Sequence, residues 1–384
     1  MRPPFLCVGM VCLNVNIFSC RTQPAPNSLH WLPKPIFMPR FSFIRSFFRL
    51  GAMLGLMLAL VLLSGCRPTS GKRESRELLH SDSLSRQIAK KMPIGQLARL
   101  WVSKGGSPSP LIHPQTVLFG PHDRIYVADV EANRVFVFDM DGKLVGQIGS
   151  EPFKYPYLAG FQGDTVAVLN RGENRLVFFK DAVKVKTITT PEAPMTYALV
   201  DGHQIWFKAT GGDDRFEGYM GPLKPNGQVG WPRARFSKPR YWRYAGNLRM
   251  WNGRLMSLSG FRPVVDFLRE DGKLDTLALR GFDSPMLSRS RLFMIGDEWN
   301  APLLSPAAVG VDSSLFVLNL RAGWLRIDRY NTEGKLRQVA ETPNAIYQKN
   351  FTPMDMDAKR LPDGHVLFAI VYKEPYPSLR LYRW

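Results

Sequence analysis

A short turn followed by an apolar strand recurs along the chain, and this recurrence restricts the fold more than any other feature. The turn Asp123-Arg124 precedes the strand Ile125–Ala128, and a second strand, Val135–Phe138, leads through the turn Asp139–Gly142 to a third. Short strands separated by tight turns predict an antiparallel meander. The same plan returns from Gly163 onward, displaced by 41 residues.

Four more copies are recognised by their first turn: Asp201-Gly202, Asn252-Gly253, Asp312-Ser313 and Asp363-Gly364. Six copies within residues 103–384 average about 47 residues each, which fits the four-stranded blades of a β-propeller. The period of two and the many Val, Ile, Phe and Tyr residues exclude a helical solenoid. An apolar content of 45% excludes a disordered chain. The sequence therefore predicts an all-β, six-bladed β-propeller over residues 94–384.

A propeller must close between its first and last blades. The last copy ends at residues 379–384 with what we expect to be its third strand. The apolar segment 97–102 lies ahead of the first blade and has no other partner. Pairing of these two segments would hide the free strand edges. We therefore expect the N-terminal strand to complete the last blade.

Polar residues around the loops carry a family resemblance. The first copy has Asp129, Asn133 and Arg134, and the second has Asn170, Asn174 and Arg175 at matching places. The string from Ile125 to Gly149 resembles an NHL repeat, and the whole chain resembles six-bladed β-propeller lipoproteins of bacteria. The fourth copy departs from this pattern, since Ser259 and Val264 replace its Asp and Arg. For all six residues of the first two copies we expect a structural role at turns, where such side chains bond backbone groups.

The N-terminal region has the order of a secretory signal peptide. Residues 50–63 form an uncharged apolar run, with Arg40, Arg45 and Arg49 before it and small residues after it. The run is shorter than the ~20 residues of a membrane-spanning helix. The tetrapeptide Leu63–Cys66 resembles a bacterial lipobox, which implies cleavage before Cys66 and lipid on its sulfur. The alternative is an uncleaved signal anchor.

These features predict a lipoprotein of the bacterial cell envelope that faces the periplasm. The resemblance favours the outer membrane, because Arg67 stands where an aspartate would signal retention in the inner membrane. We expect a signal-peptide region over residues 1–65 with translation starting at Met38, a flexible lipid-anchored linker over 66–93, and the propeller over 94–384. Removal of residues 1–65 lowers the formal net charge from +19 to +13.

A basic and aromatic segment at 231–244 is the sequence's best candidate for a binding surface. It contains no acidic residue, and we expect it to be a loop between the third and fourth blades. Arginine and aromatic side chains are common in binding hot spots. The candidate binding residues are Arg233, Arg235, Lys238, Arg240, Trp242 and Arg243. We expect an acidic protein, an anionic glycan or an anionic lipid as the partner, no nucleic acid, and a monomeric chain. The alternative is that the aromatic residues pack between blades and the arginines are solvated.

The sequence offers little support for catalysis. His122, His203 and His365 each lie at the first turn of a blade, but these blades are not all neighbours. A metal site needs convergent ligands, so we assign no metal, no cofactor and no catalytic residue. The sequence favours a protein- or ligand-binding module. The alternative is a propeller hydrolase or lyase with a metal at its central channel.

Overall fold

The computed structural model describes residues 83–103, 110–149, 152–189, 195–209, 218–236, 246–295, 302–343, 346–348 and 350–384. The chain divides into two units, Met1–Glu74 and Ser75–Trp384, and every described residue belongs to the second. The expected signal peptide, Met38 and Cys66 therefore lie outside the described residues. Within the described ranges, no helix has the length and apolar character needed to cross a membrane.

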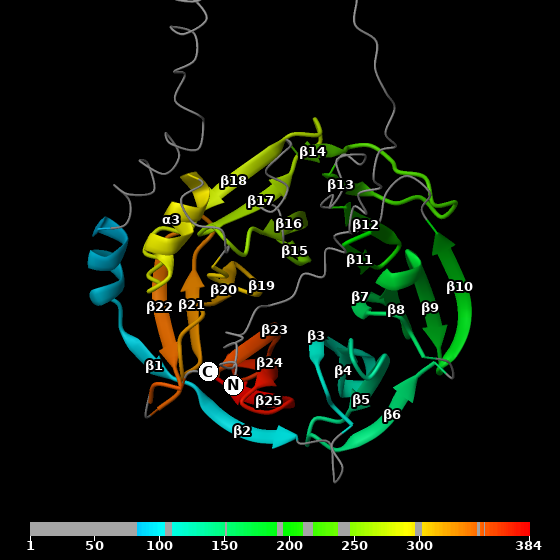
Figure 1. The fold of residues 1–384 in the computed structure, drawn as a ribbon, viewed down its shortest axis with the longest axis horizontal. Helices are drawn as coiled ribbons and strands as arrows, with labels where there is room; N and C mark the ends of the chain where they lie inside the picture. Colours follow the sequence, from blue (N-terminus) through cyan, green and yellow to red (C-terminus); the bar gives the residue numbers. More distant parts are fainter. Residues whose placement is uncertain are drawn as a thin grey trace, which may run out of the picture. The chain divides into compact units, whose positions relative to one another are not determined.

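The second unit is an all-β fold in a propeller arrangement, in which antiparallel meanders surround a common centre (Figure 1). Three sheets have four strands. The first contains β3 (Pro114–Gly120), β4 (Arg124–Asp129), β5 (Arg134–Phe138) and β6 (Leu144–Ile148). The second contains β15 (Leu248–Trp251), β16 (Arg254–Leu258), β17 (Val264–Leu268) and β18 (Leu274–Ala278). The third contains β23 (Thr352–Arg360), β24 (Val366–Glu374), β25 (Ser378–Arg383) and β2 (Ala98–Ser103).

Two larger sheets complete the arrangement. One has eight strands, β7 (Pro156–Gln162), β8 (Thr165–Asn170), β9 (Arg175–Lys180), β10 (Val183–Thr189), β11 (Tyr197–Asp201), β12 (Gln204–Ala209), β13 (Gly218–Pro222) and β14 (Ala234–Phe236). The other has five strands, β19 (Ala308–Val311), β20 (Ser314–Leu318), β21 (Arg326–Tyr330), β22 (Leu336–Glu341) and β1 (Ile94–Gln96). Between strands lie the 3-10 turns η1 (Pro121–Asp123) and η2 (Arg171–Glu173) and the helix α3 (Leu287–Ile295).

The strand pairing differs from the expected six separate four-stranded sheets. The meanders β7–β10 and β11–β14 form one sheet because β7 and β11 pair in parallel, with Val200 opposite Gly160. Gly160 permits this approach: its φ is 133°, and a Cβ at this position would collide with the carbonyl oxygen of Val200. A second difference is β1, which adds to β22 in parallel as an outer fifth strand.

Buried side chains fill the spaces between successive meanders. The described residues form six apolar clusters, and each cluster joins the facing sides of two meanders that follow one another around the centre. Neighbouring residues of one strand point to different clusters: Val117 packs toward the last meander and Leu118 toward the second. This alternation explains the period of two in the sequence.

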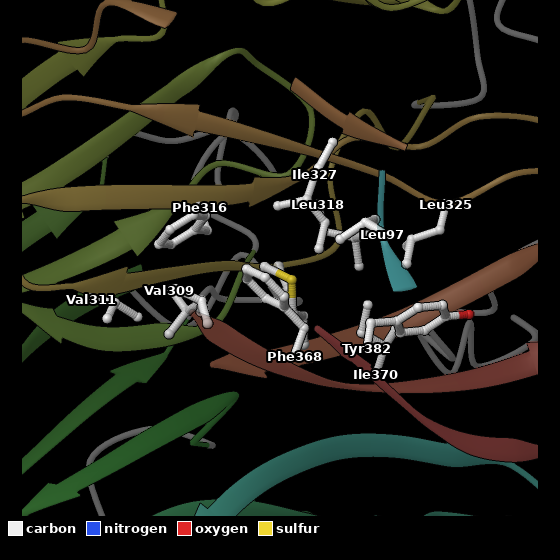
Figure 2. Close-up of a cluster of buried hydrophobic side chains, with 14 of the residues drawn as sticks. Leu97, Val309, Val311, Phe316, Leu318, Leu325, Ile327, Phe368, Ile370 and Tyr382 are labelled. Carbon is white, nitrogen blue, oxygen red and sulfur yellow. The ribbon is translucent and has the colours of Figure 1, made fainter. Parts of the chain in front are cut away.

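The N-terminal strand completes the last meander, as the sequence predicted. Strand β2 pairs antiparallel with β25, with Trp101 opposite Leu381. Leu97, just before β2, is 1% exposed and belongs to the cluster between the last two meanders (Figure 2). The two ends of the folded unit are thus held by both backbone hydrogen bonds and apolar packing.

The segment before β1 corrects the expected linker boundary. Residues 83–90 form a helix, whereas we expected a flexible linker as far as residue 93. Ile88 and Met92 pack against the cluster between the fourth and fifth meanders, and the Ser85 hydroxyl accepts a hydrogen bond from the Gly281 amide. This helix is therefore stabilised by tertiary packing. Residues 66–82 lie outside the described ranges.

Candidate functional site

The first strand of each meander lies nearest the centre, and several of these strands bring polar side chains together there (Figure 1). They surround a small cavity of about 10 Å³, which is the size of a single water site. The cavity is lined by Thr116, Tyr157, Leu158, Tyr197, Ala198, Asn247, Leu248 and Arg249, which belong to the first four meanders. We call Tyr157, Tyr197, Asn247, Arg249 and their polar neighbours Arg171 and Asp355 the axial cluster.

An ion pair between the fourth and last meanders forms the base of the axial cluster. The Asp355 carboxylate, on β23, is completely buried, and Arg249 Nη2 donates to its Oδ1 at 3.2 Å and to its Oδ2 at 3.1 Å. Asn247 Nδ2 donates to Oδ1 at 2.9 Å, and the Val117 amide donates to Oδ2 at 3.1 Å. Burial raises the pKa of Asp355, while Arg249 and these donors oppose the rise. One carboxylate thus connects three meanders across the centre.

Two tyrosines from equivalent positions form one wall. Tyr157 and Tyr197 stand on the parallel strands β7 and β11, and their rings meet edge to face with centroids 6.0 Å apart. The Arg171 guanidinium, from the turn η2, lies 4.6 Å from the Tyr157 centroid and 6.0 Å from that of Tyr197. Burial raises the pKa of the Tyr197 phenol, so it stays protonated and can donate a hydrogen bond.

Arg171 is held by aromatic rings and not by a carboxylate of the described residues. Among the described residues its guanidinium has no carboxylate partner, and its contacts are the two tyrosine rings. Arg249 is paired with the buried Asp355 carboxylate, so within the axial cluster Arg171 is the guanidinium that the tyrosine rings hold instead. A guanidinium presents paired donors that fit a carboxylate or a phosphate.

A buried lysine lies behind the second tyrosine. Lys208, on β12, is fully buried, and its Nζ lies 4.7 Å from the Tyr197 ring centroid. Its ammonium donates to the Gly246 carbonyl and, at 2.8 Å, to Ser257 Oγ, so it bridges the third and fourth meanders. Burial lowers the pKa of Lys208 to about 7, against an opposing effect of Asp266. This amine therefore changes charge near neutral pH.

A second aspartate lies two residues beyond Asp355 on the same central strand. Asp357 is partly exposed, and its Oδ2 accepts a hydrogen bond from the Phe119 amide at 2.8 Å. Burial raises the pKa of Asp357 to about 6, although Arg249 acts in the opposite direction. Like Asp355, it connects the last meander to the first.

The basic segment at 231–244 is not a single loop. Residues 234–236 form β14, the outer strand of its meander, so Arg235 lies on a strand and Arg233 precedes it. The Arg233 guanidinium stacks 5.3 Å from the Tyr219 ring centroid, and Trp231 is 70% exposed. The other four candidates, Lys238, Arg240, Trp242 and Arg243, lie outside the described residues. The structure brings none of the described candidates to the axial cluster.

The six turn residues make mostly backbone contacts. Buried Asp129 accepts hydrogen bonds from four amides, those of Ile112, His113, Glu131 and Ala132, at 2.7 to 3.1 Å. At the matching place, Asn170 Oδ1 accepts from the Lys154 amide at 2.8 Å. Asn133 and Asn174 share a left-handed backbone, with φ of 55° and 53°. Arg175 lies 3.6 Å from the Glu173 carboxylate, whereas Arg134 Nη1 is buried with no partner among the described residues.

The three turn histidines do not converge. His122 lies 3.2 Å from the Asp164 carboxylate, His203 contacts Gln162 at 2.9 Å, and His365 contacts Asp363 and Arg383. Each contact is local to its own turn or to the next meander. In the part of the chain that the structure describes, no group of three His, Cys, Asp or Glu side chains could hold a metal ion. The alternative of a metal-dependent hydrolase or lyase therefore gains no ligand set from these residues.

Sequence reasoning missed the axial cluster. Its members come from five separate stretches of the chain, and no short motif joins them. One signal was available: Tyr157 and Tyr197 stand 40 residues apart, close to the repeat length, and each lies at the start of the first strand of its copy, as its first or second residue. A second signal was the alternation of apolar residues with Asp355 and Asp357 over 354–358, because it placed two carboxylates in a strand that had to be buried.

Known proteins resemble this chain only at low sequence identity and at TM-scores below 0.5. No family model and no curated protein matches the chain. A solved structure of virginiamycin B lyase from Staphylococcus aureus is similar over 68% of this chain and 80% of its own, at 16% identity and a TM-score of 0.43. A putative exported protein from Bacteroides fragilis is similar over 75% of this chain and 94% of its own, at 11% identity and a TM-score of 0.47. Neither similarity assigns a family or an activity to this chain.

Proposed function

We propose that this protein is a ligand-binding β-propeller of the bacterial cell envelope, anchored by lipid on Cys66 and facing the periplasm, with the outer membrane favoured. The lipobox-like tetrapeptide and the apolar run before it support the anchor. The ligand enters at the axial cluster and is recognised there through an anionic group, a carboxylate or a phosphate.

The proposed ring has six NHL-like blades. In this interpretation the eight-stranded sheet is two blades whose inner strands touch at Gly160, and β1 is an addition to the fifth blade. The six apolar clusters support this number, because a closed ring has as many spaces between blades as it has blades.

The proposed function depends mainly on one observation, which is the environment of the Arg171 guanidinium. Its guanidinium lies over the aromatic side chain of Tyr157 in the axial cluster, and no carboxylate among the described residues neutralises it. A cation placed on aromatic rings keeps its hydrogen-bond donors directed outward. The protonated Tyr197 phenol beside it adds a neutral donor.

The basic segment would extend the same preference for negative charge. Arg233, Arg235, Lys238, Arg240, Trp242 and Arg243 are proposed as contacts to an acidic protein, an anionic glycan or an anionic lipid, as expected from their composition.

Melting temperatures with anions test the axial site. Inorganic phosphate and citrate should raise the melting temperature of the wild-type chain at constant ionic strength, because a ligand that binds only the folded state stabilises it. Arg171→Gln should abolish the increase, and Tyr197→Phe, which removes the neutral donor, should reduce it. Arg175→Gln is the matched control, since Arg175 ends the same turn but already faces Glu173. The proposal fails if neither anion changes the wild-type melting temperature, or if Arg171→Gln responds as the wild type does.

A further inference from the structure

The segment that joins the expected lipid anchor to the ring is itself folded onto the outer rim. From residue 83 to 103 it forms the helix 83–90, then β1 along the five-stranded sheet and β2 along the last sheet (Figure 1). This segment contains four basic residues, Arg86, Lys90, Lys91 and Arg99, and no acidic residue. All four are exposed. We call residues 83–103 the strap.

Exposed apolar side chains accompany these charges on the strap. Leu84 is 58% exposed, Ile94 is 67% exposed and Leu100 is 48% exposed. The buried side of the strap has the opposite character, because Ile88, Met92 and Leu97 pack against the ring. The strap thus presents basic and apolar residues outward although its own core contacts are already satisfied.

Helix α3 continues this surface beside the strap. The two helices share one apolar cluster, in which Ile88 of the strap and Leu287 of α3 both take part. Ser85 also bonds to Gly281, a few residues before α3. Met286, just before α3, and Leu292 are 38% and 44% exposed, and Arg289 of α3 is exposed as well. The surface formed by the strap and α3, which we call the basic rim, is therefore continuous.

The chain length limits how far the strap can be from the expected anchor. Sixteen residues separate Cys66 from the first residue of the strap. A fully extended chain of this length spans about 55 Å at most, and a flexible one averages about 22 Å. If lipid holds Cys66 in a bilayer, the basic rim is the part of the ring that the covalent tether keeps nearest to the lipid headgroups.

From these observations we infer that the basic rim docks on the surface of a bilayer that contains anionic phospholipid, so that the ring stands on its edge. The inference rests on the proposed lipid anchor. Basic side chains are attracted to anionic headgroups, and exposed leucine and isoleucine side chains can enter the interface. Edge-on docking leaves both faces of the ring open, so the axial cluster stays accessible to a ligand from the side.

The opposite rim provides an internal control. Strand β10 exposes Val183 and Val185, at 65% and 55%, next to Lys184 and Lys186. Like the basic rim, it exposes apolar side chains beside lysines, but it is not joined to the tether. A bilayer contact that depended only on exposed lysines and exposed apolar side chains should therefore protect the lysines of both rims equally.

Lysine footprinting on vesicles tests the inference. The full chain is incorporated into vesicles of phosphatidylcholine alone and of phosphatidylcholine with phosphatidylglycerol, and a membrane-impermeant amine reagent is applied before mass spectrometry. We expect Lys90 and Lys91 to be acylated at least threefold more slowly in the vesicles with phosphatidylglycerol, and 1 M salt to remove the difference. Lys184 and Lys186 should react at the same rate in both.

Two variants with equal loss of charge complete the test. Arg86→Gln with Arg99→Gln should reduce the protection of Lys90 and Lys91, whereas Arg175→Gln with Lys180→Gln should leave it unchanged. Unchanged melting temperatures show that both variants fold, since all four side chains are exposed.

The remaining outcomes separate the rim from the anchor. Equal acylation in the two vesicle types, or equal protection of all four lysines, overturns docking through the basic rim while the chain still floats with the vesicles. A chain that floats with neither vesicle type contradicts the anchor and the docking together. Protection that appears only when an envelope protein fraction is added assigns the rim to a protein and overturns the lipid interpretation.

Discussion

Lys208 shows how burial turns an ordinary residue into a pH-dependent one. Its ammonium keeps two oxygen acceptors, Gly246 O and Ser257 Oγ, but loses its hydration completely. The pKa of Lys208 is therefore about 7 in the folded state, against an ordinary value of 10.5 for a solvated lysine. Between pH 7 and pH 10.5, Lys208 keeps its proton in the unfolded chain and releases it in the folded chain. The free energy of unfolding must then increase as the pH rises from 7 toward 10.

The Lys208→Met variant should lose this dependence. For the wild type, Lys208 contributes a slope of about 1.4 kcal/mol per pH unit at most, because at most one proton is involved. We expect the free energy of unfolding of Lys208→Met to rise less steeply than that of the wild type between pH 7 and 9, measured in urea. Lys180→Met, at an exposed position, should keep the wild-type slope. Parallel curves for the wild type and Lys208→Met would contradict the low pKa.

Breaking the buried Arg249–Asp355 ion pair of the axial cluster should destabilise the fold more than breaking an exposed ion pair does. Asp355→Asn leaves Arg249, whose side chain is 12% exposed, without its charge partner. Removal of one partner of a buried pair costs about 3 to 5 kcal/mol of unfolding free energy. The control is Asp275→Asn, which breaks the exposed Arg254–Asp275 pair at 2.8 Å and should cost less than about 1 kcal/mol. Similar losses in the two variants, measured by urea unfolding, would show that the central pair is solvated.

At the scale of elements, the sequence predicted the local plan and the structure added the contacts between elements. The turn-and-strand repeat indicated each meander, and the unpartnered segment 97–102 indicated the closing strand, because both are marked by local patterns. Other features depend on contacts distant in sequence. The helix 83–90 exists because Ile88 and Met92 find an apolar cluster more than 150 residues away in the sequence. The axial cluster likewise needs the ring to close before Arg249 meets Asp355.

Gly160 tests the parallel contact between β7 and β11. Its φ of 133° suits glycine alone, and a Cβ there would strike the Val200 carbonyl. We expect Gly160→Ala to lower the free energy of unfolding by about 3 kcal/mol, combining backbone strain with the separation of two strands. Gly146→Ala is the matched control. Gly146 lies on β6 with open space around its Cα and an ordinary φ, so alanine should be neutral or slightly stabilising. Equal unfolding free energies for the two variants would contradict the close approach.

At the scale of the whole molecule, the ring is closed by a segment that comes before the first meander. Each apolar cluster depends on two neighbouring meanders, so opening one space weakens the sheets on both sides of it. Strands β1 and β2 cover the outer strand of the fifth meander and supply the outer strand of the last. Leu97, between them, fills the space between these two meanders. The strap therefore serves two purposes in our interpretation, as the closure of the ring and as its contact with the bilayer.

Stepwise N-terminal truncation separates these contributions. A chain beginning at residue 83 keeps every contact that the structure describes, so its melting temperature should equal that of the chain beginning at Cys66. A start at residue 93 removes the helix and the Ser85–Gly281 hydrogen bond and should lower the melting temperature by a few degrees. A start at residue 104 also removes Leu97 and β2, and the loss of one buried leucine alone costs about 2 to 5 kcal/mol. We expect a fall of about 10 °C or more and aggregation through the bare edge of β25. Equal melting temperatures for the chains that begin at residues 83 and 104 would mean that the ring closes without its N-terminal strand.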